Sequence, residues 1–213
     1  MYLAIEGVIG VGKTTLARLL QPMFDAEVLF EAFEENPFLS DFYADRRRYA
    51  FQTQIFFLLS RYHQQRDAVP QALERGNLIA DYTFEKDALF ARLNLGGDEL
   101  NTYFRLHAAL AERLQVPDLT VYLKVTTPTA LHRISSRDRP YERNMDADYI
   151  DQLNRTYEEH FSNPHGPTLT VDTTPLDFVR NPEDLAEVAR RIRDALGIPP
   201  FQPELPFPGR AAG

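Results

Sequence analysis

Gly7-Val8-Ile9-Gly10-Val11-Gly12-Lys13-Thr14 is the stretch of sequence that decides the fold. It matches the pattern G-x-x-x-x-G-K-S/T, and it lies between a short apolar run at residues 2–5 and a helical pattern that begins at Lys13. Glycines allow backbone N–H groups to turn inward around a phosphate, and the start of a helix adds its positive end. The stretch therefore predicts a phosphate-binding loop for a nucleoside triphosphate, with contacts from Gly7, Gly10, Val11, Gly12, Lys13, Thr14 and Thr15.

A metal position is expected beside this loop. The Thr14 hydroxyl can bind Mg²⁺, while the Lys13 ammonium reaches the outer phosphates of the same nucleotide. The apolar run at residues 78–80 ends on Asp81. Because parallel strands bring their carboxyl ends to one edge of a sheet, we expect Asp81 to be a second Mg²⁺ contact.

Five short apolar runs alternate with helical patterns along the chain. The runs fall at residues 2–5, 27–31, 78–80, 119–125 and 168–172. Helical spacing of apolar residues occurs at 13–21, 47–66, 86–93, 98–115, from the Thr127-Pro128 cap onward, at 146–161, and from Asn181 to Gly197. This alternation predicts an α/β fold with a five-stranded parallel sheet, helices on both faces, and ligands at the carboxyl ends of the strands.

Composition limits the partners of the chain. Its net charge of −8 disfavours a nucleic acid bound through its phosphates, and the absence of cysteine excludes a disulfide framework or a thiolate metal site. No apolar run approaches the roughly 18 residues of a membrane span. We therefore expect a cytoplasmic protein that acts on small molecules, without nucleic acid or membrane as partners.

The chain is short enough for one domain, which we expect over residues 1–197. Beyond it, residues 198–213 contain five prolines and no periodicity, which predicts an extended tail.

Charged residues mark two further parts of the site. The second apolar run ends on Glu31, which is the best-placed carboxylate to take a proton from an acceptor hydroxyl, with Glu34 and Glu35 as nearby competitors. Four arginines fall close together against the acidic background, at Arg133, Arg137, Arg139 and Arg143. They indicate either an anion-binding lid at about 137–143 or a solvated helix face.

Several spaced motifs, taken together and in order, resemble the deoxyribonucleoside kinases. They are Ile5-Glu6-Gly7 through Thr15, Glu31 with Asn36-Pro37-Phe38-Leu39 and Phe42-Tyr43, Phe51-Gln52, Asp81-Tyr82-Thr83, and residues 131–142. The resemblance implies a P-loop kinase fold with an arginine-rich lid. It also implies transfer of the γ-phosphate of ATP, with Mg²⁺, to the 5′-hydroxyl of a deoxynucleoside, and a homodimer.

The same resemblance implies roles for individual residues. Glu31 is then the base for the 5′-hydroxyl, Tyr43 and Glu142 hold the sugar 3′-hydroxyl, and Gln52 reads the polar edge of the base. Arg133, Arg137 and Arg139 close over the donor phosphates and act with Lys13 in catalysis. Phe90 stacks on the base, and Asp172 with Phe178 cradles the adenine of the donor.

One departure from the family bears on the substrate. Most of the family carries an acidic-Arg-Ser triplet where this chain has Asp81-Tyr82-Thr83, so a lid arginine or Arg61 has to replace the missing arginine. The stretch Asp81 to Lys86 looks like the bacterial deoxyguanosine kinase branch, which favours deoxyguanosine, with deoxyadenosine next. Asp87 is either a second reader of guanine or a surface acid at a helix start.

Two other functions share part of this pattern. A thymidylate kinase has the phosphate loop and the lid, but it needs a basic residue for the phosphate of its acceptor near the second strand, where residues 31–35 offer acids. A nucleotide-dependent switch has no use for acceptor-site residues such as Tyr43, Gln52 and Glu142.

Overall fold

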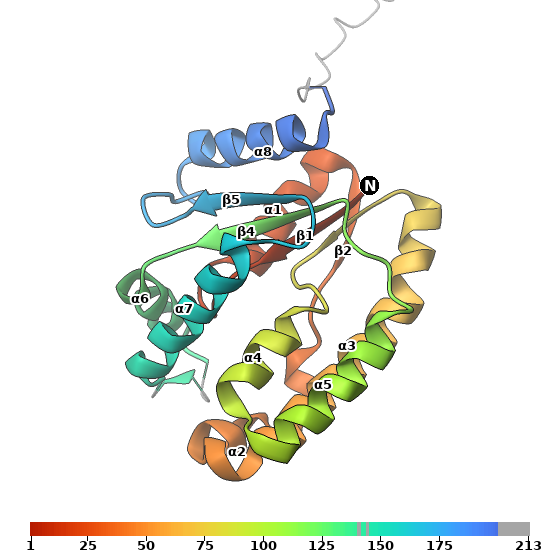
Figure 1. Cartoon of the computed structure of the whole chain (residues 1–213). Helices are drawn as coiled ribbons and strands as arrows, with labels where there is room; N and C mark the ends of the chain where they lie inside the picture. Colours follow the sequence, from red (N-terminus) through yellow and green to blue (C-terminus); the bar gives the residue numbers. More distant parts are fainter. Residues whose placement is uncertain (140–141, 144, 200–213) are drawn as a thin grey trace, which may run out of the picture.

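A parallel five-stranded sheet runs through the middle of the molecule in the computed structural model, which describes residues 1–139, 142–143 and 145–199 (Figure 1). The strand order is β2-β3-β1-β4-β5. The strands are β1 (Tyr2–Glu6), β2 (Ala26–Leu29), β3 (Asn77–Ala80), β4 (Leu119–Lys124) and β5 (Thr168–Asp172). The predicted α/β class and the five parallel strands are confirmed.

The central strand explains why the first apolar run is unbroken. β1 pairs with β3 on one side and β4 on the other, so that Ala4 lies opposite both Ala80 and Thr120. All five of its residues are buried, because helices cover both faces of the sheet at this point. The edge strand β2 is only half-buried. The best-packed strand therefore leads directly into the phosphate-binding loop.

Helices cover the two faces of the sheet. α1 (Lys13–Phe24) and α8 (Pro182–Leu196) lie on one face, and α3 (Arg46–Arg75) and α7 (Ala147–Ser162) lie on the other (Figure 1). Against these pack α2 (Leu39–Ala44), α4 (Lys86–Asn94), α5 (Gly97–Ala111) and α6 (Thr127–Arg137), and a short 3₁₀ helix η1 (Phe33–Glu35) follows β2. The helical layers surround the carboxyl ends of β1, β2 and β3.

Two helices are longer than the sequence pattern indicates. α3 continues to Arg75 instead of ending at residue 66, and it contains Pro70. Val69 and Ala72 in this extension are buried with Tyr2 and Leu78, so their packing outweighs the hydrogen bond that the proline removes. α1 likewise contains Pro22 and continues beyond the predicted end at residue 21 to Phe24, whose ring is buried.

Other element ends differ by a few residues. α5 ends at Ala111 rather than at residue 115, and Tyr103 and His107 are its buried residues. β2 ends at Leu29, so the predicted strand at 27–31 is too long and Glu31 lies in the following loop. The N-cap of α6 is Thr126 and not Thr127.

Both ends of the last helix, α8, lie where the sequence predicts them. Asn181 Oδ1 accepts a hydrogen bond from Glu183 N at 3.1 Å, and Gly197 adopts a φ of 66° at the C-cap. Pro140 and Tyr141 of the expected lid, and residues 200–213 of the expected tail, lie outside the described residues.

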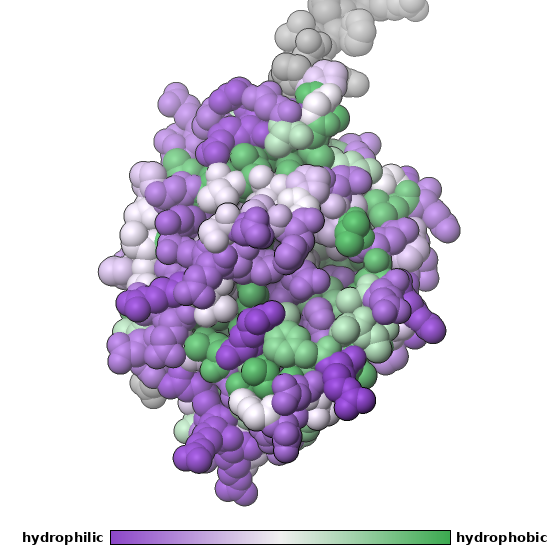
Figure 2. Space-filling view, in the orientation of Figure 1, coloured by the Kyte–Doolittle hydropathy of each residue, from purple (hydrophilic) through white to green (hydrophobic). Residues whose placement is uncertain are grey.

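The surface seen in Figure 2 is mostly hydrophilic, with apolar side chains gathered over α4 and α5. Several apolar residues of α5 are only partly buried, namely Leu100, Phe104, Leu106 and Leu110. Within the described ranges, no helix has both the length and the apolar character to cross a bilayer.

Candidate active site

The phosphate-binding loop needs glycine where its backbone passes other chain segments closely. Gly7 has a φ of 147°, and a Cβ there would lie 2.5 Å from the carbonyl oxygen of Leu123. Gly10 has a φ of 83°, and its Cβ would lie 2.6 Å from Ile134 Cγ1. Both angles lie in the left-handed region that side chains disfavour. β4 and α6 therefore hold the loop in the shape that presents its N–H groups to an anion.

Lys13 and Thr14 connect this loop to the neighbouring strand ends. Lys13 Nζ donates to the carbonyl oxygens of Gly7 at 2.6 Å and Val8 at 3.2 Å. Thr14 Oγ1 donates to Asp81 Oδ2 at 2.5 Å, and Asp81 Oδ1 accepts from Glu31 N at 2.8 Å. Burial, together with the charge of Lys86, lowers the pKa of Lys13 to about 8. One carboxylate thus joins the phosphate loop to the loop after β2.

The contact between Thr14 and Asp81 fits a magnesium position. Mg²⁺ prefers oxygen ligands, and it is usually held by one or two protein groups together with substrate phosphates and water. Here a hydroxyl and a carboxylate oxygen lie side by side at the end of the phosphate loop. No cluster of three or more His, Cys, Asp or Glu suited to a metal occurs among residues 1–139, 142–143 and 145–199. A divalent ion held mainly by substrate phosphates is the kind that these residues suit.

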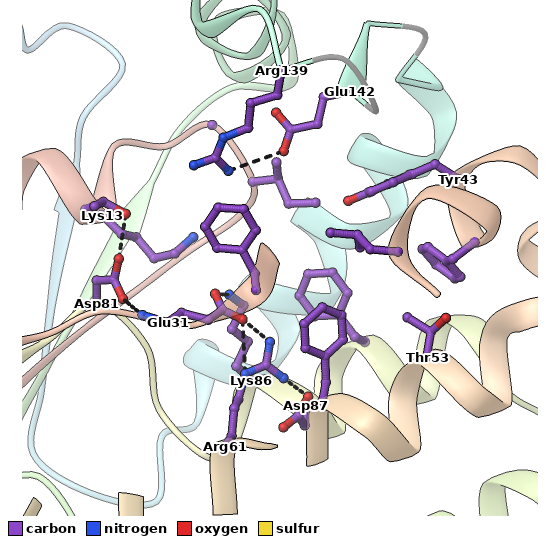
Figure 3. Close-up of a pocket in the computed structure, with 18 of the residues that line it drawn as sticks. Lys13, Glu31, Tyr43, Thr53, Arg61, Asp81, Lys86, Asp87, Arg139 and Glu142 are labelled. Carbon is purple, nitrogen blue, oxygen red and sulfur yellow. Dashed lines mark hydrogen bonds and ion pairs between the residues drawn. The ribbon is translucent and has the colours of Figure 1, made fainter. Parts of the chain in front are cut away.

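A cavity opens beside the loop (Figure 3). Side chains from the phosphate loop, β2–η1, α2, α3, β3–α4 and the lid line it. They include Lys13, Thr14, Glu31, Tyr43, Gln54, Arg61, Asp81, Lys86, Asp87, Phe90, Arg137, Arg139 and Glu142. The carboxyl edge of the sheet therefore brings together most of the residues expected on the acceptor side.

Glu31 lies between two cations within this cavity (Figure 3). Its Oε1 accepts from the guanidinium of Arg61, and its Oε2 accepts from the ammonium of Lys86. Burial alone raises the pKa of Glu31, but the charges and hydrogen bonds of Arg61 and Lys86 outweigh it and bring that pKa below its usual range. Glu31 is therefore ionised at neutral pH and able to accept a proton.

Arg61 is fixed by partners on each side. Its Nη1 forms an ion pair with Asp87, which is fully buried. Its Nε donates to Glu31 Oε1 at 3.1 Å, and its guanidinium carbon lies 4.7 Å from the centre of the Phe57 ring. Asp87 is therefore a buried partner of Arg61 and lines the cavity, so it is not a surface acid. The planar fork of arginine suits such a set of simultaneous contacts.

The residues expected to hold the sugar lie at the opposite end of the cavity. Glu142 is buried, and its carboxylate accepts from Arg137 at 2.5 Å and lies 3.7 Å from Arg139. The Tyr43 hydroxyl points into the cavity near Glu142 (Figure 3). Arg139 also stacks over the ring of Phe33, 4.1 Å from its centre. Two of the three expected lid arginines thus line the cavity in the described part of the lid.

The structure replaces Gln52 with Gln54 as the glutamine of the cavity. Gln52 is exposed on α3, whereas Gln54 is buried and lines the cavity. Residues two positions apart lie about 200° apart around a helix, so the two glutamines cannot share a face. The Gln54 Oε1 atom is buried and lacks a hydrogen-bond partner among the described residues. An unpaired buried acceptor of this kind suits a polar ligand.

Tyr82 faces away from the cavity, where it supports the loop that carries Glu31. Its side chain is fully buried, and its hydroxyl donates to Gln64 Oε1 at 2.5 Å. Gln64 Nε2 in turn donates to the carbonyl oxygen of Phe30 at 2.7 Å. The cations next to Glu31 are therefore Arg61 and Lys86, and Tyr82 has a structural role.

The residues expected around the donor nucleotide lie behind the phosphate loop. Arg133 donates to the carbonyl oxygens of Val11 at 3.0 Å and Thr173 at 2.8 Å, so it joins the loop to the segment after β5. The buried ring of Phe178 packs over Gly12. Asp172 accepts from Thr174 N, and Thr15 is exposed on α1.

Gln54 and Lys86 are two polar cavity residues that the sequence does not predict. Gln52 and Gln54 both lie beside the apolar stripe of α3, and only the helix phase separates them. Lys86 belongs to the motif Asp81 to Lys86, which by itself assigns no role to the lysine. Its position at the first residue of α4, in the short segment that follows the carboxyl end of β3, is the signal that could have found it. Among the alternatives to Glu31, Glu35 is exposed, and the side chain of Glu34 is not described.

Comparison with known proteins gives a family match over nearly the whole chain. A family model described as deoxynucleoside kinase matches residues 3–196. A deoxyguanosine kinase of Bacillus subtilis is 36% identical over 201 residues, which cover 92% of this chain and 97% of the relative. A deoxyadenosine kinase of Dictyostelium discoideum is 35% identical over 196 residues, which cover 89% of this chain and 78% of the relative.

Solved structures agree with this match. A deoxyadenosine kinase from M. mycoides with the products dCMP and a flexible dCDP has a TM-score of 0.80 and 29% sequence identity. The match covers 91% of this chain and 100% of the M. mycoides chain. The same enzyme with bound dATP has a TM-score of 0.79 at 28% identity.

Proposed function

The chain belongs to the deoxynucleoside kinase family, and from this premise we propose that it transfers the γ-phosphoryl group of ATP to the 5′-hydroxyl of a purine deoxyribonucleoside, with deoxyguanosine preferred. The observation that carries this proposal is the ionised Glu31 in a cavity that opens directly beside the phosphate loop. A carboxylate in that position has an acceptor hydroxyl as its natural partner.

The donor side of the proposed site consists of the phosphate loop and its neighbours. Phosphoryl transfer needs the triphosphate positioned and its charge neutralised. Lys13 and the N–H groups of the loop bind the phosphates, and Arg137 and Arg139 approach from the lid. Thr14 and Asp81 would hold Mg²⁺, which when bound neutralises charge on the β- and γ-phosphates.

The acceptor side consists of Glu31 and the groups at the far end of the cavity. Glu31 takes the proton of the 5′-hydroxyl as the O5′–P bond forms and the bond to ADP breaks. Because the transition state is loose, the hydroxyl becomes acidic late in the reaction, so a carboxylate of low pKa can serve as the base. Tyr43 and Glu142 orient the sugar through its 3′-hydroxyl, which aligns the 5′-oxygen with the phosphorus.

Base preference follows from the donors and acceptors deep in the cavity. Arg61 carries only N–H donors, so its side of the cavity suits the O6 acceptor of guanine and opposes the amino group of adenine. Asp87 beside it can accept from N1–H or the amino group of guanine, and the unpaired Oε1 of Gln54 can accept as well. Phe90 provides a ring for stacking. This arrangement supports deoxyguanosine over deoxyadenosine.

A homodimer remains part of the proposal. The partly buried apolar face of α5 and the exposed Leu59 of α3 are surfaces on which a second copy could pack.

The test of the proposed function is ADP release from Mg-ATP with purified protein. Deoxyguanosine, deoxyadenosine, deoxycytidine, thymidine and thymidylate are added one at a time. We expect strong stimulation by deoxyguanosine and weaker stimulation by deoxyadenosine. A preference for deoxyadenosine would overturn the base assignment alone. Stimulation by thymidylate alone, or ADP release that no acceptor changes, would overturn the acceptor site.

A further inference from the structure

Lysine is scarce in this chain, and two of its lysines face the cavity. Only Lys13, Lys86 and Lys124 are lysines among the 23 basic residues. Lys13 belongs to the phosphate loop, while Lys86 begins α4 and reaches Glu31 from the other side (Figure 3). Both lysine side chains line the same cavity beside the phosphate loop. Lys86 therefore lies near the expected position of the outer phosphate.

The two cations on Glu31 differ in freedom. Arg61 is held by Asp87 and by the Phe57 ring as well as by Glu31. Lys86 contacts the same carboxylate through an ammonium on a flexible stem, which also lies 5.8 Å from the centre of the Phe90 ring, and this ammonium has three N–H donors. One donor can stay on Glu31 Oε2 while another points to a group bound in the cavity.

Charge balance shows when such a donor is needed. In the free protein the two carboxylates Glu31 and Asp87 balance the cations Arg61 and Lys86. When Glu31 takes the proton of an acceptor hydroxyl, the cluster gains one net positive charge at the moment when negative charge is moving between phosphoryl oxygens. Arg61 stays neutralised by Asp87, so the excess charge belongs to Lys86.

We propose that Lys86 is a catalytic residue, which bridges Glu31 and the transferring phosphoryl group and donates a hydrogen bond to that group during transfer. The inference rests on the proposed function and adds a second lysine to its chemistry. The proton of the 5′-hydroxyl goes to Glu31, the O5′–P bond forms, the P–O bond to ADP breaks, and Lys86 keeps its own proton throughout. Fixed donors aimed at developing charge are among the strongest contributions to catalysis.

The alternative is that Lys86 only neutralises a buried carboxylate. A double-mutant cycle between Lys86→Met and Glu31→Gln separates the two roles, since a lysine that acts only through Glu31 has no further effect once Glu31 is neutral. Single-turnover formation of deoxyguanosine 5′-phosphate from Mg-ATP is measured in both single variants, the double variant and the wild type. Lys124→Met is the matched control, because Lys124 lies on the surface with Glu158.

We expect Lys86→Met to slow transfer by about 10²–10³-fold, as loss of one such donor does elsewhere, and the control to keep the wild-type rate. Affinity for deoxyguanosine, measured by calorimetry, stays within about threefold. In the Glu31→Gln background, Lys86→Met still slows transfer at least about tenfold. Lys86→Arg, which keeps a charged donor, recovers part of the rate, and it also serves if Lys86→Met does not fold.

No further loss from Lys86→Met in the Glu31→Gln background overturns the inference, as does a Lys86→Met enzyme with wild-type turnover. If Lys86→Met does not fold, Lys86→Arg with no activity at all in a folded protein also overturns it. A wild-type enzyme that phosphorylates no deoxynucleoside contradicts the proposed function as well, so the two failures are distinguishable.

Discussion

Glu31 carries the acceptor chemistry in this account, and its two oxygens are each held by a cation. The pairing keeps the carboxylate ionised although most of the side chain is buried. Substituting Glu31→Gln keeps its shape and removes its ability to take a proton. We expect kcat to fall by about 10²–10⁴-fold, the contribution of a positioned base. Deoxyguanosine binding, measured by calorimetry, stays within about threefold, because Arg61, Asp87 and Gln54 are intact.

An unchanged kcat in Glu31→Gln would move the base to Glu35 or Glu34. A thermal melt of the variant controls for folding, since the substitution leaves the buried charges of Arg61 and Lys86 less well balanced.

The two glutamines of α3 provide a matched pair of variants. Gln54 lines the cavity with an unpaired Oε1, and Gln52 is exposed two positions earlier. We expect Gln54→Ala to raise KM for deoxyguanosine by about tenfold or more, because the base loses a hydrogen bond in a buried site. KM for ATP should change little, and Gln52→Ala should resemble the wild type. A larger effect from Gln52→Ala would show that the helix phase is wrong.

ATP binding should depend on pH through Lys13. Burial lowers the pKa of Lys13 to about 8, and the triphosphate favours its charged form. Binding therefore requires an ammonium that the free protein loses above about pH 8. We expect the affinity for ATP to be nearly constant below pH 7 and to fall as pH rises, approaching about tenfold per pH unit above pH 8. Calorimetry between pH 6.5 and about 9.5 measures this, and a constant affinity over the range would contradict it.

At the residue scale the sequence predicts well where a motif fixes both the residue and its neighbours. Lys13, Thr14 and Asp81 lie together as expected, because the loop and a strand end determine their positions. Gln54 and Lys86 were not predicted, since their side-chain directions depend on helix phase and on a buried ion-pair network. Such a network forms only when α3, α4 and the β2 loop have packed together.

At the element scale, Glu6 at the end of β1 connects three parts of the site. It accepts from Gly7 N at 3.1 Å in the phosphate loop, from Thr83 N at 2.6 Å and Thr83 Oγ1 at 3.0 Å before α4, and from the Tyr157 hydroxyl at 3.1 Å on α7. Because the carboxylate is almost completely buried, water cannot replace it. Glu6 therefore fixes the phosphate loop relative to the segment that carries Asp81 and Lys86.

We expect Glu6→Ala to lower the free energy of unfolding by at least about 3 kcal/mol, since each buried donor that it leaves unpaired costs about 1–3 kcal/mol. Urea denaturation measures this loss. The control is Glu27→Ala on β2, where an exposed carboxylate pairs with Arg75 in solvent and contributes little. Equal losses in the two variants would contradict the connecting role of Glu6.

Most helix and strand identities were predictable from periodicity, except for the short helices η1 and α2, and the ends of the elements were less predictable. The N-cap and the terminal glycine marked both ends of α8 correctly, since each acts through its own local hydrogen bonds and backbone angles. The end of α3 depended on packing of Val69 and Ala72 against residues far away in the sequence, which no local pattern contains. Local signals thus predict ends that local chemistry decides.

At the scale of the whole molecule, strand order explains how separate motifs form one site. The order β2-β3-β1 places the ends of three neighbouring strands side by side, although Lys13, Glu31 and Asp81 lie far apart in the sequence. The alternation of strands and helices predicted a parallel sheet and a shared edge. It did not predict the order of the strands, which long-range pairing decides.

The most direct test of the central claim is the identity of the product. Purified protein is incubated with Mg-ATP and deoxyguanosine, and the phosphorylated product is examined by ³¹P NMR and mass spectrometry. The account predicts deoxyguanosine 5′-monophosphate, formed in equal amount to ADP. Inorganic phosphate in place of a phosphorylated nucleoside, or a phosphate on the 3′-oxygen, would contradict it.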